Sequence, residues 1–322
     1  MSAAAKRSSR RTAAKIGTGD PGLVAISGAA GRFGGLLVRR LHRVARVVAI
    51  DSRGFERRPA DVAHRQTEPR RRECRDVFRG GKVRTLVHLG PHHAESRHDT
   101  EGFTAAIENF SRLLEYCDRY DVKKLVLLSS ADVYGARPNN PQFLTEEAPL
   151  LAADLSALRD VDMMAQSFFW KRPDIETVIL RPVHITGGVG GAMTRYLRMS
   201  PLPVMMGYDP MIQLIHEEDL SSAVALAIAW GHRGIFNIAG PDPIPLSRIA
   251  QRLGRSVLPI PHPLIRPMLG QLTRMGKTDF HPAYIDYLRF VCMVDDRRAR
   301  EQLGFEPLRG LGETIAAVDL WE

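Results

Sequence analysis

Three glycines separate a short apolar run from a longer amphipathic segment near the start of the chain. The run LVAIS is followed by GAAGRFGG and then by LLVRRLHRV, in the order of a strand, a turn and a helix. Gly28, Gly31 and Gly34 allow the backbone to approach a pyrophosphate closely, and the N-terminus of the following helix offers free N–H donors and positive potential. We therefore expect a dinucleotide here, with Arg32 and Phe33 of the loop also in contact with it.

An acid ends the next predicted strand, RVVAID, 23 residues after Gly28. Asp51 in that place accepts hydrogen bonds from the adenosine ribose hydroxyls and repels a 2′-phosphate, which favours NAD over NADP. Arg32 and Arg53 argue mildly in the other direction. We therefore expect NAD as the cofactor, with NADP as the less favoured alternative.

Strands and helices alternate along residues 22–182. Apolar runs at 85–90, 124–130 and 174–182 read as buried strands, and residues 103–120 carry apolar side chains at helical spacing. This alternation predicts an α/β fold on a parallel, doubly wound sheet. From residue 183 to 322 short strands, helices and proline-rich connectors follow, and we expect a smaller second lobe, with some elements interleaved. The strand IFNIAG is among those assigned to that lobe.

The composition is that of an ordinary globular protein, with 44% hydrophobic and 25% charged residues among 322. No apolar run reaches the roughly 18 residues that a membrane span needs. The three cysteines, Cys74, Cys117 and Cys292, have no metal-like spacing, so a reducing cytoplasm fits best. The histidines fit no common zinc pattern, and we expect no metal. They are His88, His92, His93 and His98.

The net charge of +9 is concentrated in two stretches. Residues 1–21 form a basic tail with no apolar core of its own, and we expect it to be disordered. Residues 53–84 carry eleven Lys or Arg against five Asp or Glu. Nucleic-acid binding is one interpretation of such runs. No zinc spacing or aromatic–basic interleaving accompanies them, so a solvated tail and a solvated loop are favoured.

Several segments together resemble the extended short-chain dehydrogenase/reductase family, the NAD-dependent epimerase/dehydratase group. They are ISGAAGRFGG, ECRD, LVHLG, ENFSRLLEYC, VKKLVLLSSADVYG, VILRPVHITG, IHEEDLSSAV and IFNIAG. The resemblance implies a Rossmann-type sheet with a small C-terminal substrate lobe, and a homodimer through helices 103–120 and 155–170. It also implies cofactor contacts at Glu73, Cys74, Leu89, Asn109, Ser129, Arg181 and Pro182.

The chain departs from this family at the Tyr-x-x-x-Lys pair that serves as acid and base. Tyr120 and Lys124 have the spacing but lie before the SSADVYG segment, whereas the family's pair lies on the helix after it. The matching helix offers two registers, neither with Tyr or Lys, and losing a positioned acid–base costs about 10²- to 10⁴-fold. The two registers are Leu155 with Arg159, and Asp154 with Leu158.

Three other side chains could replace the missing pair. Ser130 matches the family's hydroxyl residue that hydrogen-bonds the substrate, and Asp132 follows on the same loop. His184 stands where relatives carry an asparagine facing the substrate, and its near-neutral pKa would suit a proton shuttle. Tyr134, in contrast, belongs to a VYG turn whose phenol packs in the family. Ile212 replaces the diphosphate-binding arginine of sugar-nucleotide epimerases, so a UDP-sugar substrate is doubtful.

Two functions remain open. The first is an atypical NAD-dependent epimerase, dehydratase or reductase that acts on a sugar nucleotide or on another small carbinol or carbonyl compound, using Ser130 with His184 or Asp132. The second is a catalytically inactive NAD-binding sensor or scaffold. The glycine loop and Asp51 are required by both. The absent Tyr-Lys pair favours the second, whereas the retained Ser130, Arg181-Pro182 and the whole substrate lobe favour the first, which we expect.

Overall fold

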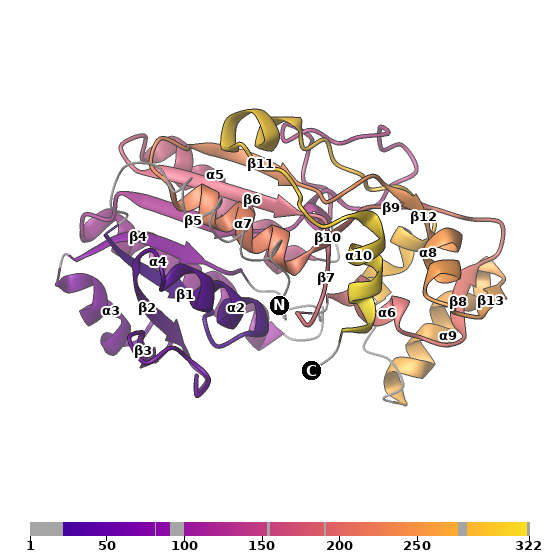
Figure 1. Ribbon diagram of the computed structural model, residues 1–322, viewed down its shortest axis with the longest axis horizontal. Coiled ribbons are helices and arrows are strands. Elements are labelled where there is room, and N and C mark those ends of the chain that lie inside the picture. The colour runs from indigo at the N-terminus through magenta and orange to yellow at the C-terminus, as the bar shows by residue number, and fades with distance from the viewer. Residues whose placement is uncertain are drawn as a thin grey trace, which may run out of the picture.

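The centre of the molecule is one sheet of seven parallel strands, in the order β11-β6-β5-β4-β1-β2-β3 (Figure 1). The computed structural model describes residues 22–80, 82–90, 100–152, 155–189, 191–275 and 282–320, so the basic tail lies outside it. The strands are β1 (Leu23–Ser27), β2 (Arg46–Asp51), β3 (Ala63–Gln66), β4 (Val83–His88), β5 (Lys124–Leu128), β6 (Glu176–Pro182) and β11 (Gly234–Ile238). The predicted Rossmann-type, doubly wound α/β sheet is confirmed.

Helices cover both faces of this sheet, as side chains on alternate sides of each strand require. Val24 and Ile26 of β1 share a buried cluster with α2 (Arg32–Leu41) and α7 (Glu217–Ile228). Ala25, between them, faces a cluster that includes α3 (Arg72–Arg79) and α4 (Thr100–Arg119). The last helix on this second face is α5 (Ser156–Lys171), beside α4.

One strand lies in a different place from the one predicted. The sequence assigned IFNIAG to the second lobe, but β11 pairs with β6 in parallel, Gly234 opposite Val178 and Ile238 opposite Pro182. Its middle is buried, so it closes the edge of the main sheet beyond β6. That assignment was wrong, because an apolar strand matches either lobe until its partner is known. β3 at the other edge was not predicted, since its sequence AHRQ is short and polar.

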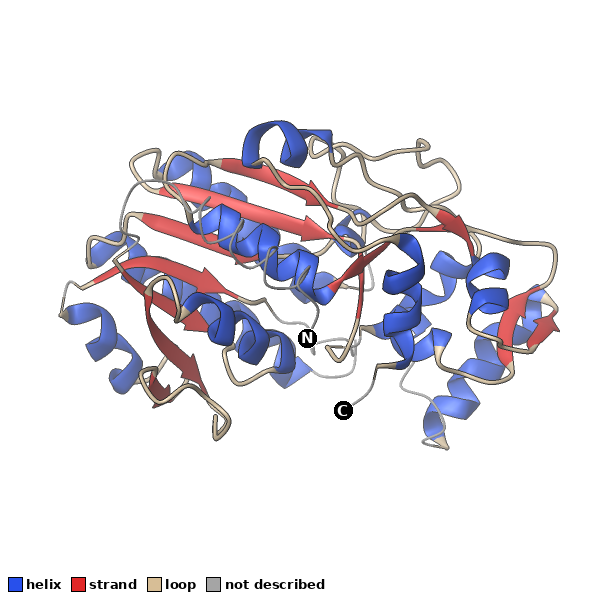
Figure 2. Cartoon of the chain, in the orientation of Figure 1, coloured by secondary structure: helices blue, strands red, loops and turns tan. Residues whose placement is uncertain are grey.

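The second lobe lies beyond the carboxyl ends of the strands, at the right of Figure 1, and is made of short elements (Figure 2). Three two-stranded sheets pair β10 with β7, β12 with β9 and β13 with β8. The strands are β7 (His184–Thr186), β8 (Leu202–Met205), β9 (Met211–Ile212), β10 (Leu214–His216), β12 (Ile244–Pro245) and β13 (Val257–Ile260). The helices are α6 (Ala192–Leu197), α8 (Leu246–Arg252), α9 (His262–Arg274) and α10 (Leu311–Ala316). Short helical turns complete the chain at η1 (Ala131–Tyr134), η2 (Pro282–Leu288), η3 (Ala299–Leu303) and η4 (Ala317–Asp319).

The lobe has its own apolar core, separate from the two faces of the main sheet. Tyr196 and Leu197 of α6 pack there with Leu202 of β8 and with Leu288 of η2. Within the described residues, no helix is long and apolar enough to cross a membrane.

Candidate active-site cavity

A cavity of about 420 Å³ lies between the glycine loop, the carboxyl ends of β5 and β6, and helix α6 of the second lobe. Open parallel sheets bind ligands at this edge, because helix N-termini and connecting loops converge there. The cavity is lined by Gly28, Ala30, Gly31, Arg32, Phe33, Gly34, Arg53, Leu89, Gly90, Leu128, Ser129, Ser130, Asp132, Leu155, Leu158, Pro182, Val183, His184, Ile185, Val189, Gly191, Ala192, Met193, Thr194, Arg195 and Tyr284.

The glycine loop forms one wall, and its backbone disfavours a side chain at two positions, by conformation at Gly28 and by lack of space at Gly34. Gly28 has a φ of +86°, which L residues rarely adopt. A Cβ on Gly34 would lie 2.5 Å from the carbonyl oxygen of Gly28. Helix α2 begins directly after Gly31, without a side-chain cap and without an acid in its first turn. Its N-terminal N–H groups and the positive end of its dipole therefore suit an anion in the cavity.

Asp51 lies next to this wall at the end of β2, and its carboxylate is already hydrogen-bonded inside the protein. The backbone N–H of Ala30 donates to Oδ2 at 3.0 Å. Arg53 donates from its backbone N–H and Nε to Oδ1, at 3.0 and 3.1 Å, and from Nη2 to Oδ2 at 3.1 Å. Burial by itself would raise the pKa of Asp51, but the hydrogen bonds from Arg53 and Ala30 outweigh it and lower that pKa. Arg53 lines the cavity. Asp51 does not line it, and is linked to it by its hydrogen bonds to Arg53 and to Ala30 of the glycine loop.

The predicted cofactor contacts divide into two groups. Leu89, Ser129 and Pro182 line the cavity, as the glycines, Arg32 and Phe33 do. Glu73, Cys74, Asn109 and Arg181 do not. Cys74 is fully buried in the core between α3 and the sheet, where burial raises the pKa of its thiol to about 12.

Arg181 has a structural role, contrary to the prediction that it contacts the cofactor. Its Nη2 and Nε donate to the two carboxylate oxygens of Asp162 at 2.7 and 3.0 Å. Its Nη1 donates to Tyr134 Oη at 2.8 Å and to the carbonyl of Glu146 at 3.1 Å. Both charged side chains are essentially unexposed, and Ser129 Oγ donates to Asp162 as well, at 2.6 Å. The guanidinium therefore holds α5, η1 and β6 together behind the cavity wall.

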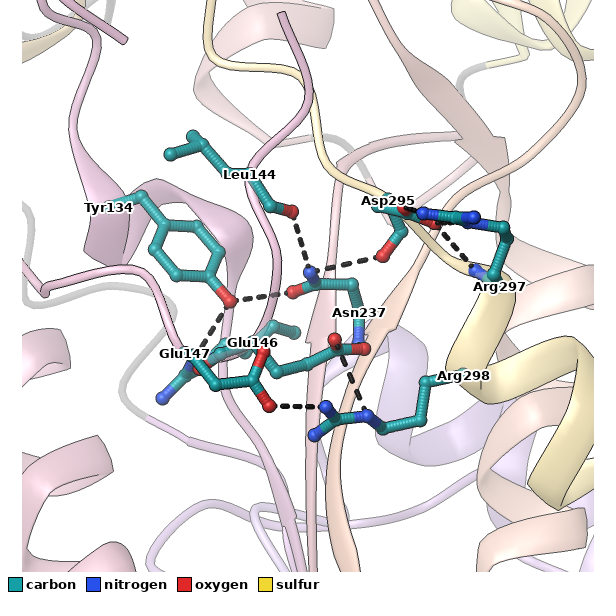
Figure 3. A network of polar contacts seen from close by, with 9 residues as sticks. Tyr134, Leu144, Glu146, Glu147, Asn237, Asp295, Arg297 and Arg298 are labelled. Carbon is teal, nitrogen blue, oxygen red and sulfur yellow. Dashed lines mark hydrogen bonds and ion pairs between the residues drawn. The ribbon is translucent and has the colours of Figure 1, made fainter. Parts of the chain in front are cut away.

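Tyr134 belongs to the same buried network, as expected for a packed phenol. Its hydroxyl donates to Oδ1 of Asn237 on β11 at 2.7 Å, and Nδ2 of Asn237 donates to the carbonyls of Leu144 and Asp295 (Figure 3). Arg298 pairs with Glu147 and with Glu146 on the same side. These contacts join the loop after η1 to the C-terminal part of the chain, and they leave Tyr134 unsuited to reach a ligand.

Ser130, Asp132 and His184, the three predicted catalytic residues, lie together on the cavity wall. Ser130 caps η1, because its Oγ accepts the backbone N–H of Asp132 at 3.1 Å. His184 Nδ1 is 3.7 Å from Oδ1 of Asp132. Burial lowers the pKa of His184 below its usual value, and the charge of Asp132 offsets part of that effect. A neutral imidazole beside a carboxylate is thus placed at the start of β7, just after β6.

Two tyrosines that sequence reasoning missed complete this cluster. Tyr284 Oη donates to Oδ2 of Asp132 at 3.3 Å, and Tyr287 Oη donates to the backbone carbonyl of Asp132 at 3.1 Å. The ring of Tyr287 meets the imidazole of His184 edge to face, with centroids 5.5 Å apart. Both come from η2, and no motif in PAYIDYL signals a site; only the fold brings this turn to Asp132.

The wall formed by α5 is apolar. Leu155 and Leu158 line the cavity, whereas Arg159 hydrogen-bonds its neighbour Asp160 at 3.0 Å. Asp154, from the alternative register, lies outside the described residues. The described part of this wall therefore offers no proton donor or acceptor from its side chains.

The earlier Tyr-x-x-x-Lys spacing is a coincidence, as predicted. Tyr120 follows the end of α4 and Lys124 begins β5, so they do not share a helical face. Lys124 is fully buried, and its Nζ donates to Glu176 at 2.7 Å and to the carbonyl of Ala229. Among the residues the structure describes, no group of three or more His, Cys, Asp or Glu could hold a metal ion; His92, His93 and His98 lie outside them.

Comparisons with known proteins identify a family and structures of the same fold. The model of the NAD dependent epimerase/dehydratase family matches residues 24–239. An uncharacterized protein of Mycobacterium tuberculosis (strain ATCC 25618 / H37Rv) is 28% identical over an alignment of 305 residues, which covers 89% of this chain and 80% of the relative.

Solved structures share the fold at low sequence identity. UDP-glucose 4-epimerase of Thermus thermophilus, in complex with NAD, has a TM-score of 0.70 at 20% identity, with 92% of this chain and 98% of that chain covered. The dTDP-glucose 4,6-dehydratase of Bacillus anthracis, also with NAD, has a TM-score of 0.69 at 16% identity, with 92% and 96% covered. A short-chain dehydrogenase/reductase superfamily protein of Agrobacterium tumefaciens with bound NAD has a TM-score of 0.70 at 18% identity, again with 92% and 96% covered.

Proposed function

The chain belongs to the NAD-dependent epimerase/dehydratase family, and we propose that it is an oxidoreductase in which NAD exchanges a hydride with a carbinol or carbonyl of a small molecule. The observation that carries this proposal is the shared cavity. Ser130, Asp132 and His184 line the same space as the glycine loop, although they lie far from it along the chain. A dinucleotide on the loop and a substrate beside His184 would therefore meet.

The residues present fit a dinucleotide. The backbone cradle at Gly28 and Gly34 has no room for a Cβ at Gly34, and the uncapped start of α2 faces the cavity. The loop would hold the pyrophosphate, and Asp51 would contact the adenosine ribose. When bound, NAD supplies the acceptor or donor of the hydride and its two electrons, so the protein has to place one proton.

That proton is the task of His184 and its neighbours. Burial lowers the pKa of His184, so the imidazole is neutral near pH 7 and can accept the proton of a substrate hydroxyl. Asp132 lies 3.7 Å from Nδ1 and stabilises the imidazolium that forms. Ser130 Oγ can donate to the reacting oxygen while it accepts the N–H of Asp132. Leu155 and Leu158 line the same cavity, where their apolar side chains would keep water away from the reaction.

The substrate class is narrowed by what lines the cavity and what does not. Solved structures with this fold include one bound to UDP-glucose and NAD. A sugar nucleotide therefore stays a candidate, together with other small carbinols. Ile212, which replaces the diphosphate-binding arginine, is buried and does not line the cavity. We favour a small, partly apolar carbinol or ketone over a nucleotide diphosphate sugar.

The testing experiment begins with the purified full-length protein. Mass spectrometry identifies any dinucleotide that copurifies, and calorimetry then gives affinities for NAD, NADH, NADP and NADPH. UDP-glucose, UDP-glucuronic acid, dTDP-glucose and a panel of secondary alcohols and ketones are tested by NADH absorbance and by chromatography of the products. Tight binding of NAD or NADH together with turnover of one compound supports the proposal. Failure of every dinucleotide to bind contradicts it.

A second candidate is a sensor or scaffold that binds NAD without turnover. The observation that favours it is the apolar pair Leu155 and Leu158 on the wall where the family resemblance places acid–base residues. Tight dinucleotide binding without conversion of any tested compound, equal in wild type and Ser130→Ala, would select this alternative.

We also propose that two copies associate through α4 and α5. These helices pack side by side, and α5 exposes Met163 and Trp170, at 51% and 76%. Large exposed apolar side chains on one helix favour burial against a second copy. Light scattering of the protein as it elutes from a size-exclusion column tests this proposal. We expect a dimer for the wild type and a monomer for Trp170→Glu.

A further inference from the structure

A phenol enters the cavity from the second lobe. Tyr284 lines the cavity and is 152 residues away in sequence from Asp132, to whose carboxylate its hydroxyl donates at 3.3 Å. The residue is 5% exposed, so the hydroxyl lies in the same enclosed space as His184. Nothing in the sequence pattern assigns a function to this residue.

We propose that Tyr284 is a catalytic residue, whose hydroxyl contacts the reacting oxygen of the substrate and exchanges a proton with it, with Asp132 as the partner of that hydroxyl. The inference rests on the proposed function and adds to it the group that α5 lacks. The second lobe thus supplies the acid–base hydroxyl as well as enclosing the substrate.

The proton balance of this step is simple. During oxidation of a carbinol, the O–H bond of the substrate breaks and its proton passes to Tyr284 Oη, while the proton of Tyr284 passes by way of the carboxylate of Asp132 to the neutral imidazole of His184. The hydride and its two electrons leave with the cofactor, and the C–O bond becomes a carbonyl. The Asp132–His184 pair therefore gains one proton per oxidation. In the reverse direction it returns that proton through Tyr284 to the new hydroxyl.

The geometry favours Tyr284 over the other tyrosines near the site. Tyr134 is fully buried and bonded to Arg181 and Asn237. Tyr287 does not line the cavity, and its hydroxyl donates to the backbone carbonyl of Asp132, away from the carboxylate. Only Tyr284, among the described tyrosines, both lines the cavity and contacts an ionisable side chain of the cluster.

A matched set of variants tests the inference. Tyr284→Phe removes the hydroxyl and keeps the ring, and Tyr287→Phe removes the neighbouring hydroxyl that bonds a carbonyl. Tyr208→Phe, at a 37% exposed position whose ring stacks on Arg289, serves as a remote control. Binding of NADH by calorimetry and thermal unfolding establish that each variant folds and keeps the cofactor site.

The first readout needs no substrate. Among the described residues, the titratable groups facing His184 are Asp132 from η1 and Tyr287 from η2, with Cys292 in contact with Tyr287. Without the hydroxyl of Tyr284, the charge of Asp132 is less satisfied and acts more strongly on the imidazole. The pKa of His184, measured by NMR in the full-length protein, is therefore expected to rise in Tyr284→Phe and to stay unchanged in Tyr208→Phe.

The second readout is turnover of the compound that the wild type converts. Tyr284→Phe is expected to lose about 10²-fold or more in kcat with little change in NADH affinity, as the loss of a proton-transferring group predicts. Wild-type kcat in Tyr284→Phe, with an unshifted His184 pKa, overturns the inference and leaves the proposed function intact. If the wild type converts nothing, the proposed function fails, and the titration of His184 alone decides whether Tyr284 is coupled to the pair.

Discussion

Arg53 donates a hydrogen bond to each carboxylate oxygen of Asp51, with Nε 3.1 Å from Oδ1 and Nη2 3.1 Å from Oδ2. The backbone N–H groups of Arg53 and Ala30 add one donor to each oxygen. A carboxylate has about four acceptor sites, and four donors already occupy them. The ribose hydroxyls expected at Asp51 therefore have to displace the guanidinium, and cofactor choice depends on both residues.

Removing the guanidinium should strengthen NAD binding. Arg53→Leu frees two acceptor sites on Asp51 and also removes the cation that would attract a 2′-phosphate. We expect NAD affinity to rise several-fold and NADP affinity to fall, because a hydrogen bond to a charged group contributes about 1.5–3 kcal/mol. Calorimetric titration of both dinucleotides checks this. Arg57→Leu, an exposed position in the same loop, is the control.

Removing the carboxylate of Asp51 should weaken NAD binding, in contrast to removing the guanidinium of Arg53. Asp51→Asn removes the negative charge. We expect this to weaken NAD binding by about 10-fold or more and to reduce the ratio of NAD affinity to NADP affinity. Asp61→Asn controls for the loss of a carboxylate at an exposed site that pairs with His42. Equal NAD affinities for Asp51→Asn and the wild type would exclude Asp51 from ribose recognition.

Two glycines of the loop should respond differently to alanine. A Cβ at Gly34 would lie 2.5 Å from one backbone oxygen and 2.6 Å from another, so Gly34→Ala should lower the melting temperature markedly. At Gly31 the nearest atoms are 3.4 Å away, and Gly31→Ala should fold normally. The added methyl group nevertheless enters the cavity, and NAD affinity should fall by about 10-fold, which corresponds to about 1.4 kcal/mol. Thermal unfolding measures the loss of stability, and calorimetry measures the loss of NAD affinity. Equal melting temperatures for Gly34→Ala and Gly31→Ala would contradict the steric argument.

The rate of oxidation should depend on pH through His184. The neutral imidazole is the active form, so activity should rise with pH through the pKa of His184 and be lost below it. Because burial lowers that pKa, this limb should lie below the ordinary histidine value of about 6.5. His184→Gln should remove the limb and reduce kcat by about 10²-fold. A pH–rate profile of the wild type with its acidic limb above pH 7 would exclude this assignment.

The buried pair behind the cavity should dominate stability. Asp162→Ala leaves Arg181 buried without its carboxylate, which should cost about 3–5 kcal/mol in the free energy of unfolding. Asp160→Ala on the same helix removes a part-exposed partner of Arg159 and should cost no more than about 1 kcal/mol. Urea unfolding of the two variants and the wild type gives both values. Similar losses of unfolding free energy in both variants would mean that the buried Arg181–Asp162 pair stabilises the protein no more than the part-exposed Arg159–Asp160 pair does.

The sequence alone was sufficient for the elements whose signal is local. The strand, glycine turn and helix around Gly28 and the acid at the end of β2 are read from neighbouring residues. So is the apolar continuity of β5 and β6. Ser130, Asp132 and His184 were selected by the family resemblance, and the structure brings all three to the cavity wall, while their catalytic roles stay a prediction.

Features that depend on distant partners could not be predicted in this way. The side of the sheet on which β11 lies is decided by its pairing with β6, and a five-residue apolar strand does not specify that partner. The motif LRP suggested that the guanidinium of Arg181 could bind the cofactor, but in the fold it donates its hydrogen bonds to Asp162 and Tyr134. Tyr284 reaches Asp132 only because the chain returns to η1 after crossing the whole second lobe.

The place of β11 also has a consequence for synthesis of the protein on the ribosome. The first six strands of the main sheet emerge with β6 as an open edge, which is a template for association with other chains. That edge is covered only when residues 234–238 have been made. Asn237 then still lacks the carbonyl of Asp295, 58 residues further on. The main sheet is therefore completed only after part of the second lobe has been made, and the last hydrogen bond of Asn237 forms later still.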